Sequence, residues 1–445
     1  MKIPDEPPDY ATILTETIQN GPGLHKLLRH STPLDAKGRY LHWDQMRNRT
    51  PPAGLTHKEW WTATALARRG MARRLPLIGT NGTPFTFANV DPVQELVHEI
   101  DRLASGQILA EDVVTSLRAS DRYLVSSLVE EAITSSQLEG ASTTRRVAKE
   151  MLQTGRPPRD RSERMIRNNY QAMQHAQDAA DEALSETLVL DLHREVTDGT
   201  LDDPSDAGRL QAPEEERIAV YWINDKLLHR PPPANELPAR LTTLCEFANG
   251  GAGDGFIHPV VRAIIVHFWI GYDHPFVDGN GRTARALFYH SMLNSGYWLT
   301  QYLTISSILR KAPAQYAKSY LYCETDGNDI TYFVIYQLEV IRRAIENLYD
   351  YLRRKVAETR EIEAMLRGSS RLNHRQLAIV GDALRDPSEP FTVAAQQRRH
   401  RVTYESARSD LVGLERLRLF EKRRVGKKHV FTALPDLHDR LARLD

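Results

Sequence analysis

The chain is poor in cysteine and lacks a long apolar run. Its 445 residues include only Cys245 and Cys323, which cannot build a disulfide framework and do not form the CxxC pairs of a zinc site. The longest strongly apolar stretch, residues 263–272, is about half as long as a bilayer crossing requires and is interrupted by His267. The first six residues have neither the basic start nor the apolar run of a signal peptide. These features predict a soluble, cytoplasmic protein without a membrane partner.

The chain also lacks a surplus of either charge. Its 58 Lys and Arg residues balance 58 Asp and Glu residues, which excludes a uniformly basic coat for nucleic acid and a uniformly acidic shell. The charges are nevertheless unevenly distributed along the chain. Residues 391–434 contain eleven basic and four acidic residues, so the rest of the chain has an excess of acidic residues. With 41% hydrophobic and 26% charged residues, the composition excludes collagenous and wholly disordered chains and suits two or three globular domains.

The predicted fold class is mainly α. Residues 1–90 are rich in turn formers and contain one expected helix at 58–74, so we interpret them as a loop-rich N-terminal region. Apolar residues then recur at spacings of three and four, which predicts a helical region at 91–160 and a helical core at 161–345. One β-rich run, residues 217–233, ends in three prolines and predicts a short hairpin.

A separate C-terminal module is expected beyond the core. A long helix over residues 332–366 leads out of the core and stops at Gly368, with residues 346–372 as the linker. Residues 373–445 then follow the order helix, helix, helix, hairpin, which is typical of a winged helix-turn-helix.

The basic surplus of 391–434 falls in this module and favours contact with DNA. The contact would run through the helix from about Thr403 and through the wing between Arg423 and Lys428. The alternative is a winged helix that serves dimerisation or the docking of a protein partner.

The most informative segment is residues 274–285, His-Pro-Phe-Val-Asp-Gly-Asn-Gly-Arg-Thr-Ala-Arg. It links an almost wholly apolar helix to an amphipathic one. Gly279 and Gly281 let the backbone turn and approach a ligand, and the free N–H groups of the second helix face the same space, which makes an anion-binding nest. Arg282 and Arg285 share one face of the first turn, where their charge opposes the helix dipole, so they indicate a bound anion.

Two further residues of the segment suit nucleotide chemistry. Asp278 is a hard oxygen ligand of the kind that Mg²⁺ uses when it is carried on phosphates. His274 can act as a general base, because an imidazole titrates near neutral pH. The alternative is an ordinary helix–helix loop with a structural histidine.

The segment resembles the signature of the Fic family, His-Pro-Phe-x-Asp/Glu-Gly-Asn-Gly-Arg-x-x-Arg, at every fixed position, and the resemblance extends over about residues 95–345. It implies a protein adenylyltransferase that moves AMP from ATP to a Tyr, Thr or Ser hydroxyl and releases pyrophosphate. It further implies that His274 deprotonates the hydroxyl, Asp278 holds Mg²⁺, and Asn280 with the loop amides binds the α-phosphate. Arg282 and Arg285 would clamp the distal phosphates.

A second motif lies upstream, where residues 135–140 read Ser-Ser-Gln-Leu-Glu-Gly. Glu139 would sit at the C-terminal end of a helix, where the dipole disfavours a carboxylate, so a cationic partner elsewhere is expected. The motif, which begins at Ser135, is similar to the inhibitory pattern of the Fic family. That resemblance implies that Glu139 pairs with Arg285 and blocks the productive pose of the γ-phosphate.

The resemblance gives meaning to further regions. The run 217–233 matches the family's flap, which pairs with a target protein segment as an added strand; the alternative is an ordinary surface hairpin. Tyr316, Tyr320 and Asn328 fall where the family lines its nucleoside pocket, although aromatic residues at helical spacing are also typical of a core. Homodimerisation and self-modification are both expected of the family.

Two other functions remain open at this stage. The same site can remove AMP from a modified protein or use a different nucleotide-like donor. The chain can also be a DNA-binding regulator whose helical core only senses nucleotide.

Overall fold

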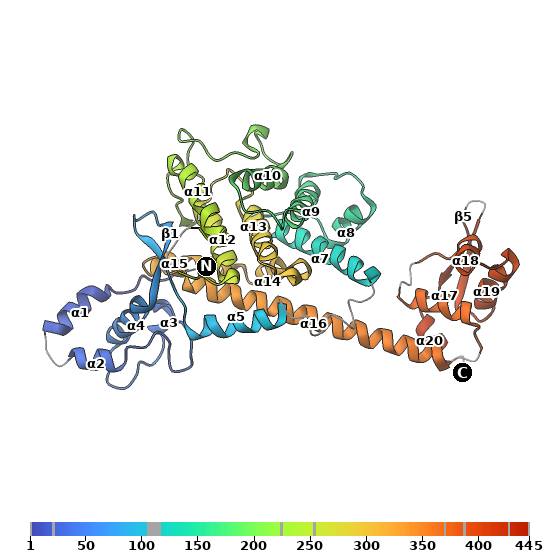
Figure 1. Cartoon of the computed structure of the whole chain (residues 1–445), viewed down its shortest axis with the longest axis horizontal. Coiled ribbons are helices and arrows are strands. Elements are labelled where there is room, and N and C mark those ends of the chain that lie inside the picture. Colours follow the sequence, from blue (N-terminus) through green and yellow to red (C-terminus); the bar gives the residue numbers. More distant parts are fainter. Residues whose placement is uncertain are drawn as a thin grey trace. The chain divides into compact units, whose positions relative to one another are not determined.

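The computed structural model describes residues 2–19, 23–104, 117–222, 226–251, 255–368, 371–385, 389–425 and 428–443. The chain forms two compact units, Met1–Leu348 and Tyr349–Asp445. Both units are built mostly of helices, which confirms the predicted fold class (Figure 1). In the described part of the chain, no helix combines the length and the apolar character that a bilayer crossing requires.

The first unit is built around two consecutive helices, α12 (Pro259–Asp273) and α13 (Asn280–Asn294). Nearly every side chain of α12 is buried, as expected for a helix that is apolar on all sides. The other helices from residue 91 onward are α5 (Asp91–Ala104), α7 (Leu117–Leu138), α8 (Arg145–Thr154), α9 (Arg161–Asp178), α10 (Glu186–Thr197), α11 (Leu237–Ala248), α14 (Ile305–Lys311), α15 (Pro313–Thr325) and α16 (Thr331–Gly368), the last of which continues into the second unit. Because α7, α9 and α10 pack on α13 and α11 packs on α12, the loop between the pair is held from several sides.

The predicted long helix and the predicted hairpin are both present. α16 begins one residue before the expected start and ends at Gly368. The β-rich run forms the antiparallel pair β3 (Val220–Trp222) and β4 (Lys226–His229), whose connection at 223–225 lies outside the described residues.

The N-terminal region contains more regular structure than the sequence predicted. Its elements are α1 (Tyr10–Gln19), α2 (Gly23–Arg29), α3 (Trp43–Met46), α4 (His57–Met71), β1 (Ala72–Ile78) and β2 (Pro84–Ala88). The helix expected at 58–74 therefore extended too far. α4 starts at a capping box between Thr56 and Glu59 and stops at Met71, because the residues that follow pair with β2 as an antiparallel strand.

His42 supports a prediction about stability. Its Nδ1 accepts a hydrogen bond from the Asp44 amide at 3.1 Å and so caps α3, and its ring stacks on Tyr322 with centroids 4.4 Å apart. Burial lowers the pKa of His42 to about 3. A histidine of the unfolded chain binds its proton near pH 6.5, so the unfolded state carries the extra proton below that pH and the free energy of unfolding falls as the solution is acidified.

We expect His42→Asn to reduce this pH dependence. Asparagine also caps helices but does not titrate. Between about pH 5.5 and 4, the slope of the unfolding free energy against pH should be smaller in the variant by about 1.4 kcal/mol per pH unit. Urea unfolding at several pH values measures both slopes, and equal slopes would contradict the assignment.

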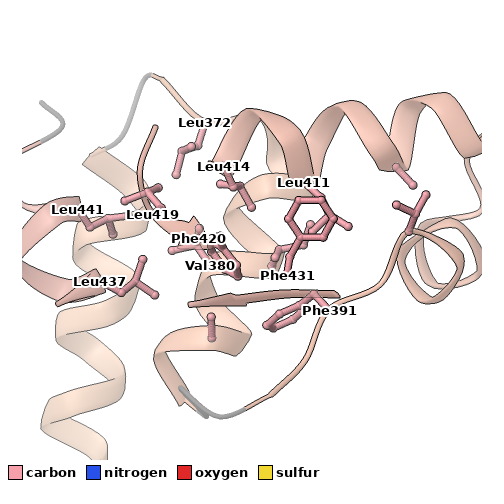
Figure 2. Close-up of a cluster of buried hydrophobic side chains, with 14 residues drawn as sticks. Leu372, Val380, Phe391, Leu411, Leu414, Leu419, Phe420, Phe431, Leu437 and Leu441 are labelled. Atoms are coloured by element: carbon pink, nitrogen blue, oxygen red, sulfur yellow. The ribbon is translucent and has the colours of Figure 1, made fainter. Parts of the chain in front are cut away.

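The second unit contains α17 (His374–Arg385), α18 (Val393–His400), α19 (Tyr404–Arg416), β5 (Phe420–Val425), β6 (Lys428–Ala433) and α20 (Leu437–Leu441). Three helices followed by a hairpin is the predicted order, and the short α20 was not foreseen. Phe391, Phe420 and Phe431 lie in a cluster of buried side chains with leucines of α19 and α20 (Figure 2). The backbone of Phe391 also pairs with that of Phe431 through two hydrogen bonds of 2.8 Å. This unit therefore has a hydrophobic core of its own.

Candidate active site

The loop between α12 and α13 turns at two residues of left-handed conformation. His274 ends α12 with φ 45° and ψ 54°, which is uncommon for a residue other than glycine, and its amide donates to the Ile270 carbonyl at 3.0 Å. Gly279 precedes α13 with φ 85°, and a Cβ there would lie 2.7 Å from the Thr197 methyl group. Glycine is therefore required at 279 both for the backbone conformation and for the close approach of α10.

His193 of α10 holds the loop through ring stacking and hydrogen bonds. Its ring stacks on Phe276 with centroids 3.7 Å apart, its Nδ1 accepts from the Gly208 amide at 3.0 Å, and its Nε2 donates to the Asp278 carbonyl at 2.9 Å. Burial lowers the pKa of His193 to about 4, so the neutral ring is the relevant form. The sequence reasoning missed this residue, because an isolated histidine on an amphipathic helix carries no motif.

Asn280 closes the loop on itself. Its Oδ1 accepts from the Phe276 amide at 3.0 Å, and its Nδ2 donates to the Phe276 carbonyl at 2.8 Å. The side chain is buried. The Asn280 side chain therefore holds the loop backbone, and its expected contact with the α-phosphate stays a prediction.

Arg282 is a buried cation with unused hydrogen-bond donors. Its side chain is fully buried and its Nη1 donates to the Val196 carbonyl at 2.5 Å. Within the described part of the chain, its Nε and Nη2 have no hydrogen-bond partner, and Nη2 lies 3.6 Å from a carboxylate oxygen of Asp278. Buried donors without acceptors are costly, so these nitrogens indicate a place for an additional acceptor such as a phosphate oxygen.

Arg285 meets the upstream motif. Its Nη2 lies 2.8 Å from Glu139 Oε1, its Nε donates to Ser135 Oγ at 2.7 Å, and its Nη2 also donates to the Ser135 carbonyl at 3.1 Å. Glu139 lies just beyond the end of α7, and Gly140 follows with φ 91°. A Cβ at Gly281 would lie 2.1 Å from Glu139 Oε1, so the missing side chain at 281 makes room for this carboxylate.

Asp278 presents a partly exposed carboxylate at the same loop. Its Oδ1 accepts from the Gly279 amide at 2.6 Å, and its Oδ2 lies 3.5 Å from Arg161 Nη2. Among the residues that the structure describes, no three His, Cys, Asp or Glu side chains are grouped to hold a metal ion. A single carboxylate nevertheless fits Mg²⁺, which often takes one or two protein ligands and completes its shell with water and phosphate oxygens.

His274 is held in its neutral form. Its pKa is lowered to about 4, mainly by burial and next by the charge of His229, while Glu139 acts in the opposite direction. At neutral pH the imidazole is therefore unprotonated and able to accept a proton.

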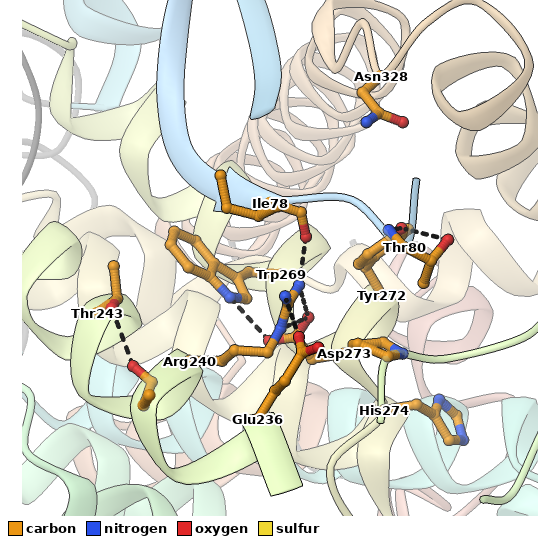
Figure 3. A network of polar contacts seen from close by, with 12 residues as sticks. Ile78, Thr80, Glu236, Arg240, Thr243, Trp269, Tyr272, Asp273, His274 and Asn328 are labelled. Atoms are coloured by element: carbon orange, nitrogen blue, oxygen red, sulfur yellow. Dashed lines mark hydrogen bonds and ion pairs between the residues drawn. The ribbon is translucent and has the colours of Figure 1, made fainter. Parts of the chain in front are cut away.

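The end of α12 beside His274 is anchored by a polar network (Figure 3). Asp273 accepts from Trp269 Nε1 at 2.9 Å and lies 2.7 Å from an Arg240 nitrogen. The same arginine nitrogen donates to the Ile78 carbonyl of β1 at 2.6 Å. This network ties the residue before His274 to α11 and to the N-terminal hairpin.

The three expected nucleoside residues separate into two groups. The Tyr316 hydroxyl lies 2.9 Å from His267 Nε2 and 3.4 Å from the Tyr320 hydroxyl, and both tyrosines are only partly buried. Asn328 is buried, and its Nδ2 donates to Asn81 Oδ1 at 3.0 Å in the turn between β1 and β2. Figure 3 shows Asn328 well apart from His274, so in this structure Asn328 holds that turn.

Comparison with known proteins identifies the class. Residues 183–292 match the family model described as Fic/DOC family. A crystal structure of a Fic family protein from Desulfovibrio desulfuricans G20 superposes with a TM-score of 0.53 and 17% identity, over 78% of this chain and 97% of the other, which shows a shared fold. Residues 183–292 of the chain therefore form a Fic/DOC domain.

Curated relatives match a stretch of about the length of this domain. The protein adenylyltransferase Fic of Drosophila grimshawi is 32% identical over 109 residues, which are 24% of this chain and 20% of that protein. The protein of the same name from Drosophila mojavensis is 33% identical over 109 residues, 24% of this chain and 19% of that protein. The match thus spans about a fifth of the length of these relatives.

Proposed function

We propose that this Fic family chain is a protein adenylyltransferase, which moves AMP from ATP to a Tyr, Thr or Ser hydroxyl of a protein. The observation that carries the proposal is the buried Arg282, whose Nε and Nη2 lack acceptors beside a glycine loop at a helix N-terminus. The neutral His274 at the other end of the loop supplies the proton acceptor. The names of the curated relatives support the same activity.

In the proposed reaction, the hydroxyl oxygen of the target attacks the α-phosphorus of ATP. The new oxygen–phosphorus bond replaces the bond to the bridging oxygen of pyrophosphate, and the hydroxyl proton passes to His274. The loop amides of Asn280 and Gly281 and the Arg282 guanidinium bind phosphate oxygens and offset their developing charge. Asp278 would hold Mg²⁺, which when bound neutralises phosphate charge.

We further propose that the chain is autoinhibited by Glu139. Glu139 Oε1 accepts a hydrogen bond from Arg285 Nη2 at 2.8 Å, and Ser135 accepts two more hydrogen bonds from the same arginine. A buried arginine that is already paired is not available to a distal phosphate of ATP. Displacement of Glu139 would therefore activate the site.

The flap is the proposed docking place of the target. Tyr221 and Leu227 lie directly opposite each other on β3 and β4 and are 56% and 37% exposed, and Ile218, two residues before β3, is 40% exposed. Exposed apolar side chains on a two-stranded hairpin suit an extended protein segment that adds to a strand edge. A loop of a second copy of this chain satisfies the same requirement, so self-modification is included in the proposal.

Intact-mass and peptide mass spectrometry tests this function. The purified chain and its Glu139→Gly variant would be incubated with Mg-ATP, and an AMP adduct on a hydroxyl of the variant is the expected result. Bound ATP without any adduct would instead favour a nucleotide sensor. Loss of AMP from a previously modified protein would favour the reverse reaction.

A second candidate function concerns the C-terminal unit, which we propose is a DNA-binding winged helix. The observation that favours it is a set of exposed basic side chains on the two helices α18 and α19, their connection and β5. They are Arg398, Arg399, Arg401, Arg408, Arg423 and Arg424. Lys427 of the predicted wing lies outside the described residues.

Duplex binding by the full chain should fall steeply with salt. Each phosphate contact contributes about 0.9 to the slope of log affinity against log salt concentration. Arg401→Ala should therefore weaken binding to all sequences and reduce the slope by about 0.9. Arg371→Ala, which removes an exposed arginine outside the basic set, serves as the control. Absence of binding at low salt would leave protein docking or dimerisation as the role of this unit.

A further inference from the structure

The carbonyl groups at the end of α12 are capped by the flap. The last carbonyls of a helix have no partner within it. Here His229 Nε2 donates to the Tyr272 carbonyl at 2.7 Å. Arg217 Nη2 donates to the carbonyls of Asp273 and His274 at 2.7 and 3.1 Å. Three consecutive carbonyls that end at the proposed proton acceptor are therefore held by two side chains of one hairpin.

The contacts of His229 determine its protonation state. Its Nε2 faces the Tyr272 carbonyl, and its Nδ1 lies 2.8 Å from Glu324 Oε2. A carbonyl and a carboxylate can only accept hydrogen bonds, so both ring nitrogens face acceptors, and the doubly protonated imidazolium is the form that satisfies both contacts. A cation at this position stabilises the negative end of the α12 dipole.

Arg217 connects both ends of the hairpin to the backbone at the end of α12. It precedes β3, and its Nε donates to the carbonyl of Pro232, which follows β4, at 2.8 Å. Its Nη1 also contacts Gln211 Oε1, and the Gln211 amide donates to the Pro275 carbonyl at 2.9 Å. The base of the flap and the backbone around His274 are thus one hydrogen-bonded assembly.

We propose that Arg217 and His229 are positioning residues that couple the flap to His274, so that a target docked on the flap finds the proton acceptor already oriented. This inference rests on the proposed adenylyltransferase function. The left-handed backbone of His274 is unfavourable for a residue with a side chain, and the contact of Arg217 with the His274 carbonyl holds it. Neither residue touches the phosphate-binding groups of the loop in the described contacts, so nucleotide binding should be independent of them.

The first test compares rates in the activated Glu139→Gly chain. Arg217→Ala should lower kcat for AMP transfer by about 10- to 100-fold, because a small misplacement of a reacting group has costs of this order. KM for ATP and the Kd of Mg-ATP should stay unchanged. Arg217→Lys, which keeps the charge but not the fork of donors, should give an intermediate rate and guards against a folding defect. Arg230→Ala removes an exposed arginine next to His229 and should have no effect.

The second test uses the charge of His229. The groups that act on His274 are His229, Glu139 and Arg217, and the groups that act on His229 from neighbouring elements are Glu324 and Asp273. His229→Gln can keep a donor for the Tyr272 carbonyl but loses the positive charge. Because that charge lowers the pKa of His274, the variant should move the acid limb of the pH–rate profile to higher pH.

NMR titration of His274 in selectively labelled protein reports the same shift without any need for activity. If the Glu139→Gly chain transfers no AMP but His274 titrates at higher pH in His229→Gln, the adenylyltransferase function fails and the coupling stands. If AMP transfer is present and the variants at 217 and 229 change neither kcat nor the titration of His274, the coupling is wrong.

Discussion

Replacement of His274 with alanine in the Glu139→Gly chain is expected to lower the rate of AMP transfer by about 10² to 10⁴. The proposed reaction requires a group that accepts the hydroxyl proton as the new oxygen–phosphorus bond forms. His274 meets this requirement because burial lowers its pKa to about 4 and leaves it unprotonated at neutral pH. Binding of Mg-ATP should persist, since Arg282 and the glycine loop remain.

Labelled-AMP incorporation from ATP measures the rate, and calorimetry with Mg-ATP measures binding. His175→Ala is a matched control, because that histidine is partly exposed on α9 and pairs with Glu195 at 2.9 Å, away from the loop. An unchanged rate in His274→Ala would show that another group takes the proton. A rate loss accompanied by loss of Mg-ATP binding would point to collapse of the loop.

Replacement of Glu139 with glycine is expected to raise AMP transfer roughly ten- to a hundred-fold. A hydrogen bond to a charged group contributes about 1.5–3 kcal/mol, and about 1.4 kcal/mol corresponds to a factor of ten. Release of this bond frees Arg285 for a distal phosphate. Glu139 lies beyond the last residue of α7, so the glycine does not interrupt a helix.

Two control variants distinguish the effect of the Glu139 charge from the effect of any substitution near it. Glu139→Gln keeps the shape but removes the negative charge, so an intermediate activation is expected. Glu130→Gln changes a carboxylate of α7 that pairs with Arg145 at 2.6 Å, and this change should leave the rate unchanged. Equal incorporation by the wild-type chain and the Glu139→Gly variant would remove the autoinhibition proposal.

Local sequence was sufficient to predict the loop and its helices. The apolar residues of α12, the glycines and arginines of 274–285, and the helical spacing on either side all lie within one continuous stretch, and a continuous stretch carries its own turn and helix signals. The meeting of Glu139 with Arg285 was also expected, although here the expectation came from resemblance, since 146 positions separate the two residues in the chain.

Other parts could not be predicted locally. α4 ends at Met71 because the following residues, β1, pair with β2. Helix propensity depends on the local sequence alone and therefore cannot predict this pairing. His193, Arg217 and His229 carry no motif, and each acts through a contact with a distant backbone carbonyl. Asn280 belongs to the motif, but only the folded loop shows that its amide is engaged with Phe276.

The sequence by itself determined that the chain is mainly helical, that it contains a loop matching the Fic signature with a histidine, an aspartate and two arginines at fixed spacing, and that an excess of positive charge lies near the C-terminus. Those properties depend on composition and on residues that are close together in the sequence. Only the tertiary structure decided which donors remain unused on Arg282 and which side chains hold the backbone of His274. These properties depend on burial and on hydrogen bonds between distant segments, and both arise only when the helices and the flap pack together.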